Sequence, residues 1–144
     1  MTPDGIAHAR VKQSFDRQGM LRHLGVELLQ AKVGMVELRL PYSDWVTQQQ
    51  GGYHGGAMGT LADVAAGYAG LTVAPDGSEV ATVEYKINFL AAFQGGHLHA
   101  TGQVVRAGKR IIVTSAMVTH RSPDGQVRDC AIMQQTLACV AKTY

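Results

Sequence analysis

Cysteine is scarce in this sequence, and a disulfide framework needs more of it. The 144 residues include only two, Cys130 and Cys139. If both lie on one strand, their nine-residue separation is about 30 Å, far beyond the reach of a disulfide bond. We therefore expect two free thiols and a chain that folds in a reducing compartment.

Long apolar runs and strong net charge are also absent. No run approaches the ~18 apolar residues of a membrane span, and the first 15 residues lack the apolar part of a signal peptide. The net charge of +2 is too small for a nucleic-acid-binding face. The composition, 46% hydrophobic and 17% charged, excludes a disordered chain, a collagen and a coiled coil. We predict one cytoplasmic domain over residues 1–144, with neither a membrane nor nucleic acid as partner.

Near the N-terminus, apolar residues recur at near-helical spacing. Further along the chain, apolar and polar residues alternate. The first pattern predicts a helix within residues 1–24, ended by Gly19 and Gly25. Alternation over residues 26–40 predicts a strand or a hairpin around Gly34. The apolar positions of the predicted helix are Ile6, Val11, Phe15 and Met20.

Residues 54–74 predict a second helix that is unusually rich in glycine and alanine. Each glycine inside a helix costs about 1 kcal/mol relative to alanine, which a helix tolerates when a sheet wraps closely around it. We therefore expect this helix in the core. Four strands are predicted after it, at residues 80–92, 97–105, 110–121 and 126–141, with turns between them. A long helix followed by hairpins predicts an α+β fold with helices on one face of an antiparallel sheet.

The start of the second helix carries the densest functional signal. His54 is followed by Gly55 and Gly56, and a helix N-terminus offers unpaired N–H groups and a partial positive charge. The two glycines let a ligand approach the backbone closely, so the segment is a candidate for polarising a carbonyl group. Asp63 follows in the same helix, where a buried carboxylate is costly unless it is paired or used. The alternative for Asp63 is a partly exposed side chain, or one that caps a neighbouring loop.

Gly55 and Asp63 are eight residues apart, which is about 12 Å along a helix axis. One carbonyl carbon cannot contact both residues of the same chain. If both act on one substrate bond, they come from two chains, and the site lies at a dimer interface.

Several segments together resemble the PaaI-like hotdog-fold acyl-CoA thioesterases of the 4-hydroxybenzoyl-CoA thioesterase superfamily. The resemblance covers about residues 40–140. Its motifs are Gly52-Tyr53-His54-Gly55-Gly56, the eight-residue spacing to Leu61-Ala62-Asp63, the segment VATVEYKINFL at residues 80–90, and Arg106-Ala107-Gly108-Lys109-Arg110.

The resemblance implies a hotdog fold over residues 25–144, in which an antiparallel sheet wraps around one long central helix. It also implies homodimers that pair into homotetramers, hydrolysis of an acyl-CoA, and no cofactor or metal. The backbone N–H of Gly55 would polarise the thioester carbonyl. Asp63 of the opposite subunit would act as general base or as nucleophile.

The resemblance assigns further residues to the site. Gln48 stands where the family often has asparagine, and Gln49 or Gln50 is the alternative at that place. His54 would orient the start of the helix or help to bind the thioester, and the Thr82 hydroxyl would assist the attacking water unless Thr82 is an ordinary strand residue. The basic turn at residues 106–110 would hold the phosphates of CoA, unless it is simply a solvated turn. All the residues that the resemblance assigns to substrate binding are Gly56, Glu84, Phe89, Arg106, Gly108, Lys109 and Arg110.

Other chemistries fit the sequence less well. His97 and His99 alternate on one strand and can face one metal, but no third ligand is evident. Ser14 and Ser43 lack the G-x-S-x-G setting of a serine hydrolase. On the same fold, the rival functions are a hydroxyacyl-thioester dehydratase and a non-catalytic acyl-CoA-binding module. The acyl group stays open among phenylacetyl, hydroxybenzoyl and medium-chain types.

Overall fold

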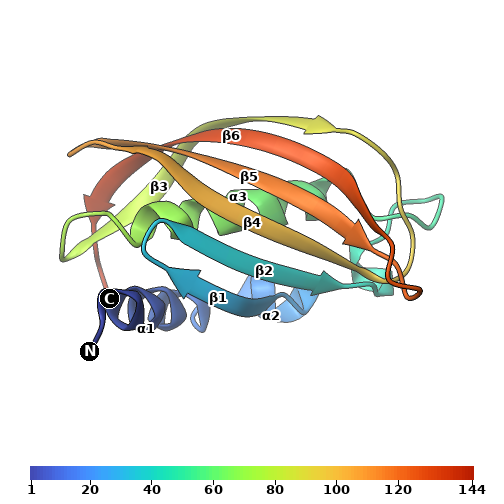
Figure 1. Cartoon of the computed structure of the whole chain (residues 1–144), viewed down its shortest axis with the longest axis horizontal. Coiled ribbons are helices and arrows are strands. Elements are labelled where there is room, and N and C mark those ends of the chain that lie inside the picture. The colour runs from blue at the N-terminus through green and yellow to red at the C-terminus, as the bar shows by residue number, and fades with distance from the viewer.

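The computed structural model describes all 144 residues, and they form helices packed on one antiparallel sheet (Figure 1). The helices are α1 (Pro3–Phe15), α2 (Gly19–Leu24) and α3 (Gly55–Leu71), with a short 3-10 helix, η1, at Asp44–Val46. The strands are β1 (Glu27–Lys32), β2 (Met35–Pro41), β3 (Ser78–Phe89), β4 (His97–Ala107), β5 (Ile111–Arg121) and β6 (Val127–Ala141).

The sheet curves around α3, while α1 and α2 lie beside β1 (Figure 1). The strand order is β1-β2-β4-β5-β6-β3, and every neighbouring pair is antiparallel. β3 follows α3 directly in the chain, yet it lies at the edge of the sheet and pairs only with β6. One side of β3 therefore has no strand beside it.

Small residues bring the backbone of the sheet against the backbone of α3. A Cβ atom at Gly102 of β4 would lie 2.2 Å from the Ala65 carbonyl oxygen, and one at Gly70 would lie 2.3 Å from a methyl group of Leu137. Gly102 is therefore required by the close approach of two backbones, whereas a side chain at Gly70 would have to displace the Leu137 methyl group. This confirms the expected α+β hotdog arrangement, in which a sheet wraps around one long helix.

The single helix predicted within residues 1–24 is wrong, because the structure has two. α1 ends at Phe15, and Gln18 takes an extended conformation with ψ at 100° before α2 begins. Gly25 ends α2 in the left-handed region, with φ at 82°. Ile6 on α1 and Met20 on α2 are both more than half exposed, while Val11 on α1 is fully buried. A spacing pattern that spans a break cannot predict which face packs.

The alternation of apolar and polar residues correctly predicted the hairpin at Gly34 and the inward face of β5. The expected hairpin forms at Gly34, whose φ of 82° suits glycine. Along β5, the inward side chains of Ile112, Thr114, Ala116 and Val118 are all buried, as the alternation requires.

Both cysteines are free thiols on β6, as expected from their spacing. Cys130 is buried against the sulfur of Met58, and burial raises the pKa of its thiol to about 11. None of the helices has the length and apolar character that a membrane crossing requires.

Candidate active site

The N–H group of Gly55, at the first residue of α3, has no hydrogen-bond acceptor within the chain. The N–H groups that follow it are all occupied. His54 Nδ1 accepts from Gly56 at 2.8 Å, and the His54 carbonyl accepts from Ala57 and Met58. The dipole of α3 reinforces the one free donor, so the position suits a carbonyl oxygen that gains negative charge.

His54 is the N-cap of α3, which agrees with a role in orienting the start of the helix. A Cβ atom at Gly56 would lie only 3.0 Å from His54 Nδ1, so glycine leaves room for the capping ring. The N–H of Gly56 is already bound to that ring. Gly56 therefore supports the cap and has no free N–H for a substrate.

Asp63 is partly exposed in the chain, not fully buried as its helix suggested. Thr82 of β3 donates its hydroxyl hydrogen to Asp63 Oδ1 at 2.7 Å. Gln135 of β6 donates a side-chain N–H to the same carboxylate oxygen. Hydrogen bonds to an ionised acceptor are stronger than neutral ones, so the two donors orient the carboxylate and leave Oδ2 for another partner.

Sequence reasoning missed Gln135. Its side chain is 1% exposed, and its Oε1 accepts a hydrogen bond of 2.9 Å from the buried hydroxyl of Thr114 on β5. Gln135 alternates along β6 with Met133 and Leu137, which are both buried. The sequence did offer a signal for Gln135, because this polar residue stands at an inward position among apolar ones. A buried amide must be hydrogen-bonded, so such a residue indicates a polar partner inside the protein.

β3 runs along the face of α3 that carries Gly55, Gly59 and Asp63. The Phe89 ring lies 3.3 Å from where a Cβ of Gly55 would be, and the Tyr85 hydroxyl lies 3.1 Å from that of Gly59. The structure thus places the predicted Phe89 beside the free N–H of Gly55. Gly59 lies between Gly55 and Asp63 on this face of α3, under the Tyr85 hydroxyl.

Past Asp63, this face of α3 borders a cavity of about 160 Å³ between α1, α3 and β3, which we call the α1 hollow. It extends from the Asp63–Thr82 pair to the side chain of Tyr68. Its lining residues are Ser14, Gln18, Asp63, Val64, Gly67, Tyr68, Glu79, Val80 and Thr82.

Two predicted site residues make no hydrogen bond to Asp63 within the chain. The side-chain oxygen of Gln48 accepts from the backbone N–H of Gln50 in its own turn, and Gln48 makes no hydrogen bond to Asp63. Glu84 follows a bulge in β3 and accepts from Thr136 on the neighbouring strand. The chain therefore does not bring Gln48 or Glu84 to the Asp63 carboxylate.

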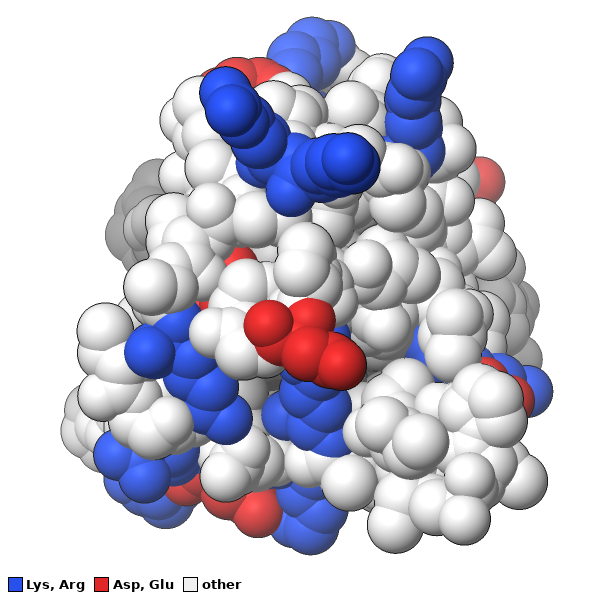
Figure 2. Space-filling model, turned by 90° about the vertical axis from the view of Figure 1, so that its left-hand side faces the viewer, with Lys and Arg blue, Asp and Glu red and all other residues white.

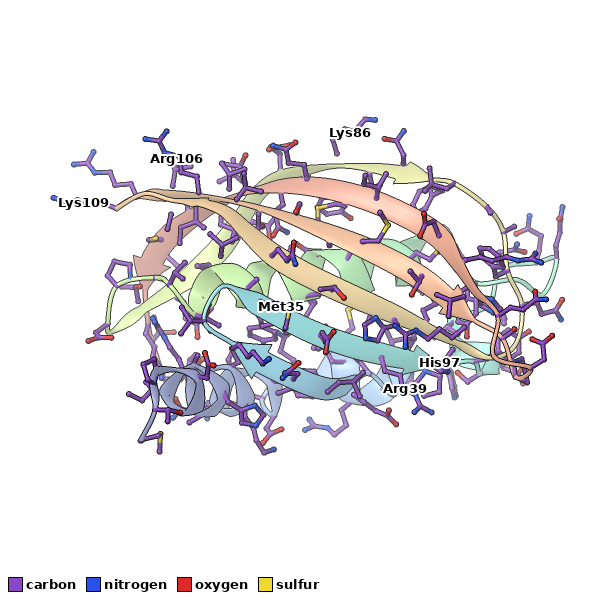
Figure 3. The ribbon with its side chains drawn as sticks, viewed as in Figure 1. Met35, Arg39, Lys86, His97, Arg106 and Lys109 are labelled. Carbon is purple, nitrogen blue, oxygen red and sulfur yellow. The ribbon has the colours of Figure 1, made fainter.

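Basic side chains gather at the upper part of one end of the molecule (Figure 2). Arg106 and Lys109 project outward there, from the hairpin that joins β4 to β5 (Figure 3). Both are exposed, as is Arg110, and none of the three forms an ion pair within the chain. A Cβ at Gly108 would lie 2.7 Å from the Ile111 carbonyl oxygen, so Gly108 keeps the turn tight. The arrangement leaves three cations free for an anionic group.

His97 and His99 lie on β4 near Arg39 and Arg121. The Nε2 atom of His99 is 3.8 Å from Glu37, and burial is the largest cause that lowers the pKa of both histidines. No group of three or more metal-ligating side chains surrounds them.

Comparisons with known proteins bear directly on this arrangement. The sequence profile of the thioesterase superfamily matches residues 50–125. A 1,4-dihydroxy-2-naphthoyl-CoA hydrolase of Listeria monocytogenes is 30% identical over 105 residues, which span 72% of this chain and 85% of that protein. The chain belongs to the thioesterase superfamily.

Solved structures of the superfamily share its fold. A thioesterase family protein from Silicibacter pomeroyi is 34% identical, with a TM-score of 0.91 over 94% of this chain and 99% of that one. The PaaI protein from the phenylacetic acid degradation operon of E. coli has a TM-score of 0.87 over 99% of both chains, at 20% identity. The PaaI-like resemblance of the sequence is therefore confirmed at the level of family and fold. The profile match includes Gly55, Asp63, Thr82 and the basic hairpin, but it ends before Gln135.

Proposed function

We propose that this protein hydrolyses acyl-CoA thioesters at sites shared between two copies of the chain. The observation that carries the proposal is the pair of complementary groups on α3. Gly55 has a free N–H at the start of the helix, and Asp63 has an oriented carboxylate eight residues later. That separation is about 12 Å along the axis, so one thioester can meet both groups only if they come from different chains.

The free edge of β3 supports pairing with a second copy. An edge strand with unpaired backbone groups is a template for another strand. Val83, Tyr85 and Phe89 on β3 are 61%, 42% and 51% exposed, which is unusual for large apolar side chains on a strand beside a site. A partner on this edge would cover them and would bring its own α3 to face the first.

The reaction then follows from the groups present. The Gly55 N–H of one copy donates to the thioester oxygen, where negative charge develops. In the general-base route, Asp63 of the other copy accepts a proton from water while the water oxygen bonds to the acyl carbon. The tetrahedral intermediate collapses, the carbon–sulfur bond breaks, and CoA thiolate leaves and takes up a proton. In the nucleophile route, the Asp63 carboxylate itself bonds to the acyl carbon, the carbon–sulfur bond breaks, and CoA thiolate leaves and takes up a proton. Water then cleaves the resulting anhydride, which releases the free acid and restores the Asp63 carboxylate.

The exposed cations of the β4–β5 hairpin suit the phosphate groups of CoA. The Listeria relative, whose name denotes a CoA-ester hydrolase, supports the same substrate class.

Release of free thiol from a panel of acyl-CoAs tests the proposal, with the wild type compared with Asp63→Asn. We expect thiol release by the wild type and at least a ~10²-fold lower kcat in the variant with little change in KM, as for a group that acts in the transition state. Hydration of an enoyl-CoA without thiol release would establish a dehydratase instead. Tight binding without turnover would establish a binding module.

A further inference from the structure

His120 is a buried titratable residue that the reaction above does not use. It is the last inward residue of β5 and is 5% exposed. A buried polar ring needs a hydrogen-bond partner, and the Nε2 atom of His120 donates to the Gly95 carbonyl at 2.9 Å. Gly95 belongs to the segment between β3 and β4, residues 90–96, which we call the β3–β4 loop. The side chain therefore ties the end of β5 to a loop.

A second buried side chain binds the same part of this loop. Tyr53 is 3% exposed, and its hydroxyl donates to the carbonyls of Gly95 at 3.1 Å and Gly96 at 3.3 Å. Burial is the largest cause that raises the pKa of Tyr53, so the hydroxyl keeps its hydrogen. Gly95 and Gly96 have φ values of 71° and 57°, and glycine loses more conformational freedom on folding than any other residue. Bonds from outside the loop are therefore needed to fix this part of it.

The β3–β4 loop in turn binds the backbone just before α3. The Phe93 carbonyl accepts from the backbone N–H of Tyr53 at 2.9 Å. The Phe93 ring stacks on the His120 ring, with centroids 4.5 Å apart and planes 7° apart. Figure 1 shows the loop after β3 and the turn before α3 at the same end of the molecule. His120 and Tyr53 thus hold the loop and, through it, the start of α3.

Gly55 is preceded by two residues whose N–H groups are both bound. Tyr53 donates to the β3–β4 loop, and His54 donates to the Val46 carbonyl at 2.8 Å. These bonds fix the peptide units that lead into α3, so they set the direction of the free N–H of Gly55. A donor of this kind is effective because it is aimed before the reaction begins. A displacement of about 1 Å in an active site can cost about 10²-fold in rate.

We propose that His120 is a positioning residue for the N–H of Gly55 that polarises the thioester carbonyl. It acts through the β3–β4 loop, together with the Tyr53 hydroxyl, and not by contact with the thioester, because its ring packs between Phe93 and Tyr53. This inference rests on the proposed thioesterase function and adds a residue to that site which lies outside the groups that react.

Kinetics of variants test the inference on the acyl-CoA that the wild type cleaves best. His120→Leu removes the N–H and the stacking, and we expect kcat to fall about tenfold while KM stays within about twofold of wild type. His120→Gln keeps a side-chain N–H that can reach the Gly95 carbonyl, so it should lose less. Tyr53→Phe should lower kcat about three- to tenfold, the worth of one hydrogen bond.

His99→Gln is the matched control for a buried histidine. His99 is 8% exposed, but it faces away from the core, because Leu98 and Ala100 beside it on β4 are the fully buried inward residues. Its ring lies 3.8 Å from Glu37 and not against the β3–β4 loop. This variant should keep the wild-type kcat.

Mixed dimers show whether His120 acts on Gly55 of its own chain. Co-expression of Asp63→Asn with Gly55→Pro, which lacks the N–H, leaves one site that joins Gly55 of the first chain with Asp63 of the second. We expect His120→Leu to lower the activity about tenfold when it is added to the Asp63→Asn chain. Added to the Gly55→Pro chain, it should have little effect. Tyr53→Phe, which keeps its ring, takes the place of His120→Leu if the leucine variant does not fold.

The outcomes separate this inference from the proposed function. If the wild type cleaves no acyl-CoA, the proposed function itself fails. If it does, and His120→Leu and Tyr53→Phe keep the wild-type kcat, only the role of His120 is overturned. An equal loss of activity in the two mixed dimers also overturns it, because a general loss of stability does not depend on which chain supplies Gly55.

Discussion

Gln135 donates a side-chain N–H to the Oδ1 atom of Asp63, across the space between β6 and α3. The amide is itself held by the Thr114 hydroxyl, so a chain of three side chains runs from β5 through β6 to the helix. Gln135 and Thr114 are buried, while Asp63 is partly exposed. The rigid sheet therefore fixes the carboxylate from behind and leaves its other oxygen accessible.

Replacement of Gln135 should slow the reaction without weakening substrate binding. Gln135→Leu removes one of the two donors to Asp63, and we expect kcat to fall about 10- to 100-fold with little change in KM, because a misoriented base loses its alignment. Steady-state kinetics check this. Gln134→Leu is the matched control, since Gln134 is exposed on the outer face of the same strand.

The Gln135→Leu variant also leaves the Thr114 hydroxyl buried without a partner, which costs about 1–3 kcal/mol of stability. The double variant Thr114→Val, Gln135→Leu replaces both partners with apolar groups and should recover most of that stability. If it also recovers wild-type kcat, Gln135 serves stability and does not position Asp63.

Mixed dimers should regain activity that each inactive variant lacks. Gly55→Pro removes the free N–H but suits the first turn of a helix, and His54 already has a ψ of 137°, the region favoured before proline. Co-expression of Gly55→Pro with Asp63→Asn leaves one intact site in each mixed dimer. Random pairing predicts about a quarter of the wild-type activity.

Thiol-release assays on the co-expressed, unseparated mixture measure this recovery, beside each variant expressed alone. The Phe89 ring must shift slightly to accept the proline, and it has room because it is 51% exposed. Mixed dimers that stay as inactive as the single variants would show that both groups do not serve one shared site.

Loss of a hairpin cation should affect only substrates that carry the nucleotide of CoA. We expect Arg110→Ala to raise KM several-fold for an acyl-CoA, and to leave KM nearly unchanged for the same acyl group on N-acetylcysteamine, which has no phosphates. Lys86→Ala is the control, because Lys86 is exposed on β3, away from the hairpin (Figure 3). Equal changes in KM for both thioesters would remove the hairpin from CoA binding.

The stability of the fold should fall as the pH drops below about 6.5. Burial, reinforced by Arg121, lowers the pKa of His99 from its ordinary value of 6.5, while Glu37 opposes the shift. The unfolded chain therefore binds this proton more readily than the folded one, so the stabilisation is present above pH 6.5 and is lost on acidification. Denaturant unfolding at pH 7 and pH 5 should show a smaller loss in His99→Gln than in the wild type. An identical loss in both would assign the pH dependence to other groups, such as His97.

Local pattern predicted most of the elements, for identifiable reasons. The alternation on β5 and the turn at Gly34 depend on strand period and glycine conformation, which act over a few residues. The first helix was mispredicted because the spacing of apolar residues continues through Met20, across the break at Gln18, although Gly19 beside it marks a stop. The position of the break depends on how α1 and α2 each pack against the rest of the protein.

The sequence alone determined the helix that begins at His54-Gly55-Gly56, the place of Asp63 on it, and the family resemblance, because short-range spacing and helix geometry carry all three. Only the tertiary structure decided which donors meet Asp63. Thr82 is 19 residues and Gln135 72 residues away along the chain, and strand pairing, not local pattern, brings them together. Likewise, the Gly55 N–H is free because no acceptor lies near it, and the space at Gly67 is open because no side chain fills it. Both facts depend on how the whole chain packs.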